Sequence, residues 1–234
     1  MTNNKNLITK SVSKPAKDLF IDIAEMGLDE LTGKLAKDSE FLKQLPIIKW
    51  LFIGNNIRST IQSAFFIKKY ASFIGQIATD ESLDKEKLLT IFSDNKVYTE
   101  VIDNTILYLD RYHNELKAKL LGELFVQTFK ENKFKRKEYN SLMFSIEQIH
   151  PFDGVEKLKQ FYDYRLETES NLDEEARRDA WAKGSKIDYQ PLSTTGLLIL
   201  PNGGVQAGDL GGAYLNDIGK RFYEAVVINC KFTD

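Results

Sequence analysis

Apolar residues recur every three or four positions through most of the first 165 residues of the chain. This spacing gathers them on one face of a helix, because an α-helix repeats about every 3.6 residues. Such stripes occupy residues 19–31, 83–92, 97–109, 116–129 and 139–149. The pattern predicts a helical domain over residues 13–165, and we expect the polar residues 1–12 before it to form a flexible arm.

Residues suited to capping or breaking a helix mark several of the expected boundaries. Ser13, Asp38 and Asn114 each precede an apolar stripe, and such side chains accept hydrogen bonds from the first amides of a helix. Pro46 interrupts the short helix that begins near Asp38, since proline disfavours helical geometry in the residue before it. Pro151 ends the apolar stripe at residues 139–149, and Leu158, Phe161 and Tyr162 predict a further helix.

The character of the sequence changes after residue 165. Residues 166–190 are highly charged and predict a connector, with one helix at 173–183. Beyond it, the apolar run Leu197–Leu200 predicts a short strand, and the glycine-rich turn that follows favours a return strand. We therefore expect a mainly α protein, in which a helical bundle precedes a small α/β module at residues 191–234.

The end of this module carries a recognisable sequence. The stretch Tyr214–Phe222 reads Tyr-Leu-Asn-Asp-Ile-Gly-Lys-Arg-Phe and follows a glycine-rich segment. It resembles the closing strand and helix of a winged-helix module, with Asn216 at a position where threonine is usual. The resemblance implies a winged-helix-like fold for the C-terminal module and, as one function of that fold, DNA binding.

A second resemblance concerns the N-terminal helices. The helical pattern around Pro46, Lys69 and Phe73 is similar to that of uncharacterised bacterial proteins found beside defence genes. This resemblance implies a bacterial protein with a role in antiviral (phage) defence. It assigns no functional residue.

Composition narrows the range of functions. The chain has 234 residues, of which 42% are apolar and 28% charged, values typical of a folded protein. One cysteine and two histidines cannot form an internal disulfide or a Cys/His zinc site. No apolar run spans a bilayer and no signal peptide precedes the first helix, so we expect a cytoplasmic protein, with peripheral attachment at the inner membrane face as an alternative.

The segment between Glu40 and Asp80 contains no acidic residue and is mostly apolar. One interpretation is a buried helix pair whose lysines extend their charged ends to the surface. A second is an interfacial helix on an anionic membrane, and a third is a face that binds a protein. The candidate residues of this membrane or partner surface are Lys49, Trp50, Phe52, Arg58, Lys68 and Lys69.

Two basic clusters are candidates for nucleic-acid contact, because cations that neutralise phosphates supply much of the affinity for DNA. The candidate residues are Lys133, Lys135, Arg136 and Lys137 in one cluster and Lys220 and Arg221 in the other. A solvated loop and a protein-contacting module are the alternatives. Nucleic acid is therefore one candidate partner.

The sequence offers no catalytic constellation. His113 and His150 lie in charged or helix-terminal contexts, and Cys230 lies near the end of the chain, so we expect structural roles for all three. The glycine-rich stretch matches neither a dinucleotide fingerprint nor a phosphate loop. We expect no catalytic residue, no metal ion and no cofactor.

These observations lead to one leading hypothesis and two alternatives. The leading hypothesis is a non-enzymatic intracellular bacterial protein that acts by association, as a membrane- or partner-contacting effector or adaptor in phage defence. A protein partner or a second copy of the chain is expected. The alternatives are a winged-helix DNA-binding regulator and an enzyme whose carboxylates converge only in the folded protein.

Overall fold

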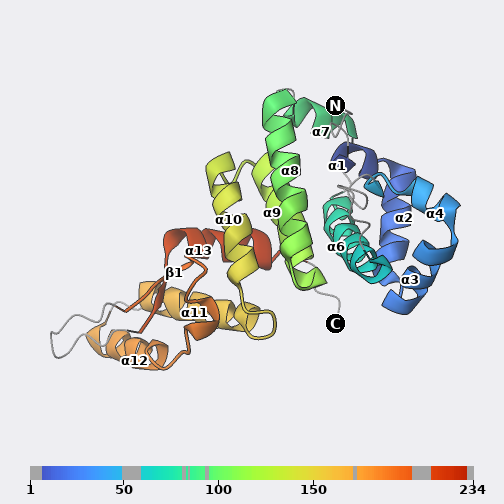
Figure 1. Cartoon of the computed structure of the whole chain (residues 1–234). Coiled ribbons are helices and arrows are strands. Elements are labelled where there is room, and N and C mark those ends of the chain that lie inside the picture. The colour runs from blue at the N-terminus through green and yellow to red at the C-terminus, as the bar shows by residue number, and fades with distance from the viewer. Residues whose placement is uncertain are drawn as a thin grey trace. The chain divides into compact units, whose positions relative to one another are not determined.

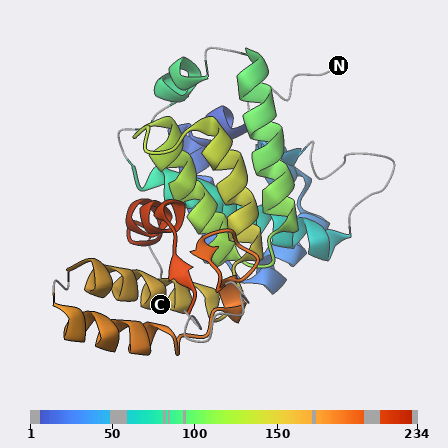
Figure 2. The same ribbon diagram turned by 90° about the vertical axis from the view of Figure 1, so that its left-hand side faces the viewer.

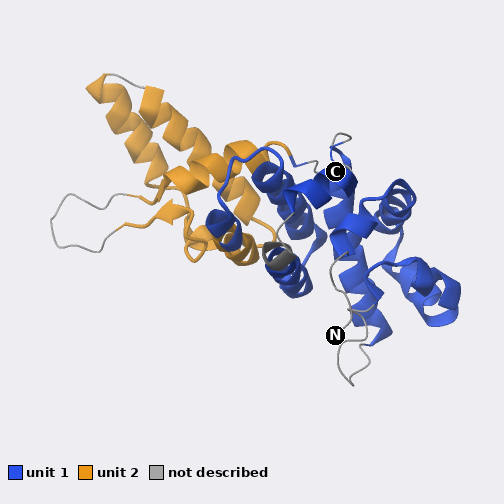
Figure 3. Ribbon diagram, turned by 90° about the horizontal axis from the view of Figure 1, so that it is seen from above, with its two compact units in different colours: residues 1–140, 230–234 blue, residues 141–229 orange. Residues whose placement is uncertain are grey.

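The protein is mainly helical, as the sequence predicts (Figure 1). The computed structural model describes residues 7–48, 59–80, 83, 85–92, 95–170, 173–201 and 212–230. Figure 3 shows the two compact units into which the chain divides: residues 1–140 with 230–234 form unit 1, and residues 141–229 form unit 2. This division differs from the predicted domain boundaries, because it falls within a helix rather than at the charged stretch.

Unit 1 begins with four short helices. These are α1 (Leu7–Ser11), α2 (Lys14–Glu25), α3 (Leu28–Lys37) and α4 (Ser39–Gln44). Within the predicted arm 1–12, residues 7–11 are helical instead, because Leu7 and Ile8 bury their side chains in the core. The stripe at 19–31 divides into two helices at Gly27, which has extended backbone geometry.

The predicted caps of unit 1 differ in what their side chains do. Asp38 accepts hydrogen bonds from the amides of Glu40 and Phe41, and so caps α4 as expected. Ser13 precedes α2, but its hydroxyl donates to the carbonyl of Lys10 and makes no cap. In these two cases the sequence predicts the position of the capping residue more reliably than the hydrogen bond that its side chain makes.

The core of unit 1 forms where α6 (Thr60–Ala78) packs between α2 and α9 (Glu115–Phe129). The two longer helices approach closely at Gly122, where a Cβ atom would lie 2.7 Å from the carbonyl oxygen of Phe73. Aromatic rings fill the adjoining space, and the centroids of Phe73 and Phe125 are 5.9 Å apart. Helices α7 (Lys85–Ile91) and α8 (Asn95–Arg111) complete the unit.

Helix α10 (Arg136–Gln148) contains the boundary between the units, and unit 2 continues with a helical hairpin. In Figures 1 and 2, α11 (Gly154–Ser170) and α12 (Glu174–Gly184) run side by side in opposite directions. Gly184 permits this approach, because a Cβ atom there would lie 2.2 Å from the ring of Tyr164. Much of the charged stretch predicted as a connector is therefore packed helix.

The rest of unit 2 consists of the 3₁₀ turn η1 (Gln190–Leu192), strands β1 (Leu198–Ile199) and β2 (Tyr214–Leu215), helix α13 (Asp217–Phe222) and the π-helical turn η2 (Tyr223–Val227). The strands are antiparallel, with Leu198 opposite Leu215. Asn216 caps α13 by accepting a hydrogen bond from the amide of Gly219 at 2.8 Å. The structure confirms both predicted strands. Residues 202–211, which connect them, lie outside the described part of the chain.

Candidate functional site

The acid-free segment contributes two described residues to the predicted membrane or partner surface. Lys49, Trp50, Phe52 and Arg58 lie outside the described residues. The remaining part of the segment is dominated by α6, most of whose side chains are buried. The exposed apolar residues of α6 are Ile61 and Phe65, near its N-terminus.

Lys69 has a structural position rather than a surface one. Its residue is only 7% exposed, and its Nζ donates to the carbonyl oxygens of Asp110 and Tyr112, each at 2.8 Å. These carbonyls end helix α8, where the helix dipole is negative and lacks internal hydrogen-bond donors. Lys69 therefore acts as a buried cationic cap on α8 and does not extend to an anionic surface.

Lys68 is engaged as well. Its Nζ lies 3.1 Å from Oε1 of Glu115 on α9, and the other carboxylate oxygen accepts a hydrogen bond from Ser72 at 3.0 Å. Two of the six residues predicted for the surface thus have intramolecular partners. For the described residues, the structure favours the interpretation of a buried helix over that of an interfacial one.

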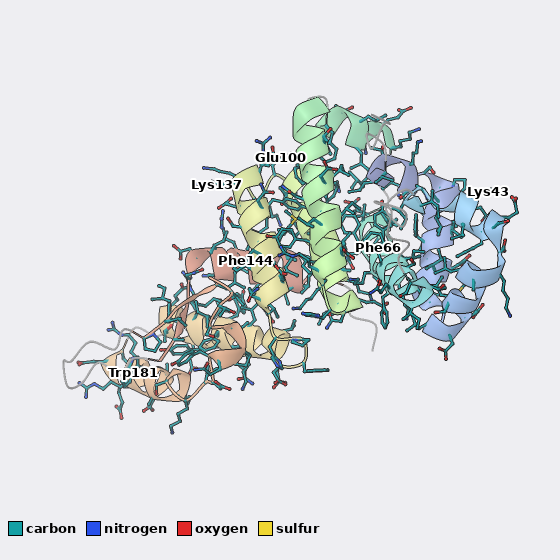
Figure 4. The ribbon with its side chains drawn as sticks, in the orientation of Figure 1. Lys43, Phe66, Glu100, Lys137, Phe144 and Trp181 are labelled. Carbon is teal, nitrogen blue, oxygen red and sulfur yellow. The ribbon has the colours of Figure 1, made fainter. Side chains whose placement is uncertain are left out.

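The first basic cluster lies at the turn between α9 and α10. Lys133, Lys135, Arg136 and Lys137 are all exposed there, whereas Phe134 is buried. Figure 4 shows Lys137 at one end of α10. Because the aromatic ring faces the core, this turn offers charge without a stacking surface for bases.

The second cluster is partly neutralised within unit 2. Lys220 lies 2.5 Å from a carboxylate oxygen of Glu169, and this contact raises the pKa of the lysine. The same glutamate bonds Arg165, which also donates to the carbonyl of Leu215. This network fastens β2 and α13 to α11, so the charge of Lys220 serves the fold, while Arg221 is exposed.

His113, His150 and Cys230, the candidates for catalytic chemistry, each lie in different local surroundings. His113 is exposed, and His150 has Asp153 beside it at 3.5 Å, at the exposed start of α11. Burial raises the pKa of the Cys230 thiol to about 12, so the thiolate is scarce at neutral pH. Among the described residues, no three His, Cys, Asp or Glu side chains are grouped as a metal site requires.

Sequence reasoning did not identify one surface of unit 2. Helix α12 buries only Ala180 and Gly184, and Trp181, labelled in Figure 4, is exposed. A shallow depression of about 400 Å³ is lined by Glu174, Arg177, Arg178 and Trp181. These four residues have the spacing i, i+3, i+4 and i+7, which places them on one face of the helix and could have identified them. We call them the α12 face.

A buried polar cluster in unit 1 was also not predicted. The Glu123 carboxylate on α9 accepts hydrogen bonds from Gln76 at 2.8 Å and from Gln127 at 2.7 Å. Its residue is 6% exposed, and burial raises the pKa of the carboxyl group. The Cys230 sulfur lies 3.9 Å from the side-chain oxygen of Gln76. The sequence signal is faint, because these polar residues stand within otherwise apolar stripes.

Comparisons with known proteins identified no relative of this chain. A scan against protein families, a search of curated proteins and a search of solved structures each found no match. Within the described helices, none combines the length and apolar character that crossing a bilayer requires. The functional argument therefore depends on the surfaces themselves.

Proposed function

We propose that this protein is non-enzymatic and acts by association with a protein partner, which it contacts through the α12 face of unit 2. The observation that carries the proposal is Trp181, which is 43% exposed on a helix that buries only two small residues. The role in bacterial phage defence stays a prediction from the resemblance of the N-terminal helices.

The chemistry of the α12 face suits a binding surface. Tryptophan and arginine are the residues most enriched among those that dominate binding energy at protein interfaces. Arg178 pairs with Glu174 at 2.7 Å, and both residues line the same depression as Trp181. A partner that fits this face would offer an apolar pocket for the indole ring and a carboxylate within reach of Arg177.

Affinity purification from cells that naturally express the protein tests this proposal. Truncation of a central tryptophan costs about 2 kcal/mol or more of binding energy, so Trp181→Ala should reduce partner recovery by more than tenfold. Leu89→Ala is the matched control, because Leu89 is 45% exposed on α7 in unit 1. Equal recovery with the two variants, or no specific partner with the unaltered protein, would refute the proposal.

A second candidate function is nucleic-acid binding, which the four exposed cations of the α9–α10 turn favour. Within residues 191–234, two antiparallel strands precede α13, which supports the predicted resemblance to the closing part of a winged-helix module. Two features of α12 count against nucleic-acid binding. This helix carries as many acidic as basic residues, and it lies antiparallel to α11.

Electrophoretic mobility of a DNA duplex at low salt tests this second function. Binding to phosphates weakens with salt by a slope of roughly one per cation, so replacing Lys133, Lys135, Arg136 and Lys137 with glutamine should flatten that slope. Lys159 and Lys183, which have carboxylate partners on helices of unit 2, provide control substitutions. No shift of the unaltered protein at low salt would reject nucleic-acid binding.

A further inference from the structure

Unit 1 contains a groove that neither its core packing nor the proposed partner surface explains. Helices α2, α6 and α9 enclose about 330 Å³ of space, which is within the usual range for small-molecule sites. Ile21, Ala24 and Gly75 supply an apolar lining, and Ser72, Gln76 and Thr79 add hydrogen-bonding groups. An apolar lining with a few fixed polar groups is the usual composition of such a site.

Gly75 keeps this groove open. It lies within the 19-residue helix α6, where glycine is less favourable than alanine. A Cβ atom at Gly75 would meet nothing within 4 Å, so no close packing requires glycine there. Gly122 on α9 is the contrast, since a Cβ atom there would collide with α6. The glycine at position 75 thus costs helix stability and leaves space that a side chain would otherwise fill.

The polar side of the groove is held in place by the rest of unit 1. Ser72 donates to Glu115, and that carboxylate is already paired with Lys68. Gln76 is 4% exposed and donates to the buried carboxylate of Glu123. These groups are therefore oriented before any ligand arrives, which reduces the entropy lost on binding.

The charge at the groove favours a cation. Glu25 of α2 lines it with an exposed carboxylate, and the described part of the chain provides no salt bridge to that group. Lys119 of α9 is the cationic residue of this lining, against the two carboxylates of Glu25 and Glu115, and it takes part in an interaction within the chain. The charge of Glu115 is offset by Lys68. Glu25 is thus the charged lining residue that a ligand can pair with at least cost.

We propose that the α2–α6–α9 groove binds a small organic amine, whose apolar body lies against Ile21, Ala24 and Gly75 and whose ammonium group pairs with Glu25. This site is independent of the α12 face, which belongs to unit 2. Its loss would leave the proposed partner binding intact, and the reverse also holds.

Three probes of one shape test the charge preference. Phenethylamine is a cation at neutral pH, 2-phenylethanol is its neutral counterpart, and 3-phenylpropionate is an anion. We expect millimolar phenethylamine to shift the amide NMR signals of α2 and α6 in the full chain. An exposed ion pair contributes up to about 1 kcal/mol, so the amine should bind about fivefold more tightly than the alcohol. Equal binding of all three probes, preferred binding of the anion, or no binding would overturn the proposal.

Two variants with matched controls locate the site. Gly75→Leu fills the groove and should abolish the shifts, whereas Gly33→Leu, at another open helical glycine on α3, should leave them unchanged. Glu25→Gln should bring amine binding down to the level of the alcohol, whereas Glu86→Gln on α7 should not. Thermal unfolding checks that each variant folds. Binding that survives Gly75→Leu in a folded protein places the amine elsewhere and refutes the site.

Discussion

The role of Lys69 can be tested by replacing it with methionine. Methionine keeps an unbranched apolar stem of similar length but removes the ammonium group. In the folded protein this group donates to the carbonyls of Asp110 and Tyr112 at the end of α8. The variant leaves the buried carbonyl of Tyr112 and the more exposed carbonyl of Asp110 without that donor, and it removes a cation from the negative end of the helix dipole. We therefore expect Lys69→Met to destabilise unit 1.

The magnitude follows from those two contacts. A hydrogen bond to a charged group contributes about 1.5–3 kcal/mol, and release of a buried ammonium from its desolvation cost offsets part of the sum. The expected loss is on the order of 3 kcal/mol in the free energy of unfolding. Lys68→Met is the matched control, because the side chains of Lys68 and Glu115 are 21% and 38% exposed. Such a partly exposed ion pair contributes about 1 kcal/mol or less.

Urea unfolding followed by circular dichroism measures both variants. If the denaturant slopes stay equal, the difference in midpoint gives the difference in stability. A Lys69→Met loss no larger than that of Lys68→Met would refute the cap. Flotation with anionic vesicles separates this role from membrane contact. A stable Lys69→Met protein that loses vesicle binding would restore the interfacial interpretation of α6.

Three further predictions concern burial and packing. Gly184→Ala should destabilise unit 2 by roughly 1–3 kcal/mol, because the added Cβ would collide with the ring of Tyr164. Gly33→Ala, at an open helical position, should instead stabilise the protein by up to about 1 kcal/mol. Thermal unfolding measures both changes in stability, and equal effects of the two variants would contradict the prediction. Cys230 should react slowly with a thiol reagent at pH 8 in the folded protein and rapidly in urea, because burial raises its pKa to about 12; fast native labelling would contradict this. The raised pKa of Glu123 contributes stability at pH values below the unfolded pKa of 4.5, and this contribution is lost as pH rises through the folded pKa. Glu123→Gln should therefore flatten the decline of stability with pH in a series of unfolding curves. Identical pH profiles of the variant and the unaltered protein would argue against this role.

Some of the architecture follows directly from local sequence. Asp38 and Asn114 each accept a hydrogen bond from an amide of the helix that follows, as their positions before apolar stripes predict. A cap depends on residues at most three positions away, so the sequence contains all of the information it needs. The apolar stripes likewise predict helices, since their period is a property of the chain alone.

Other features depend on residues far apart in the chain. Lys68 and Lys69 are adjacent and chemically alike, yet one pairs with a half-exposed glutamate and the other is buried against the end of α8. Their partners lie more than forty residues away, and no local pattern indicates which lysine meets which group.

The sequence by itself determined that the protein is mainly helical, where several helices begin, and that a short pair of strands precedes the last helix. Tertiary structure decided which charges are neutralised, that Gly75 borders an open groove, and that Trp181 faces outward. The physical reason is range: helical periodicity and capping act over a few residues, whereas burial, ion pairing and cavities depend on how separate helices meet.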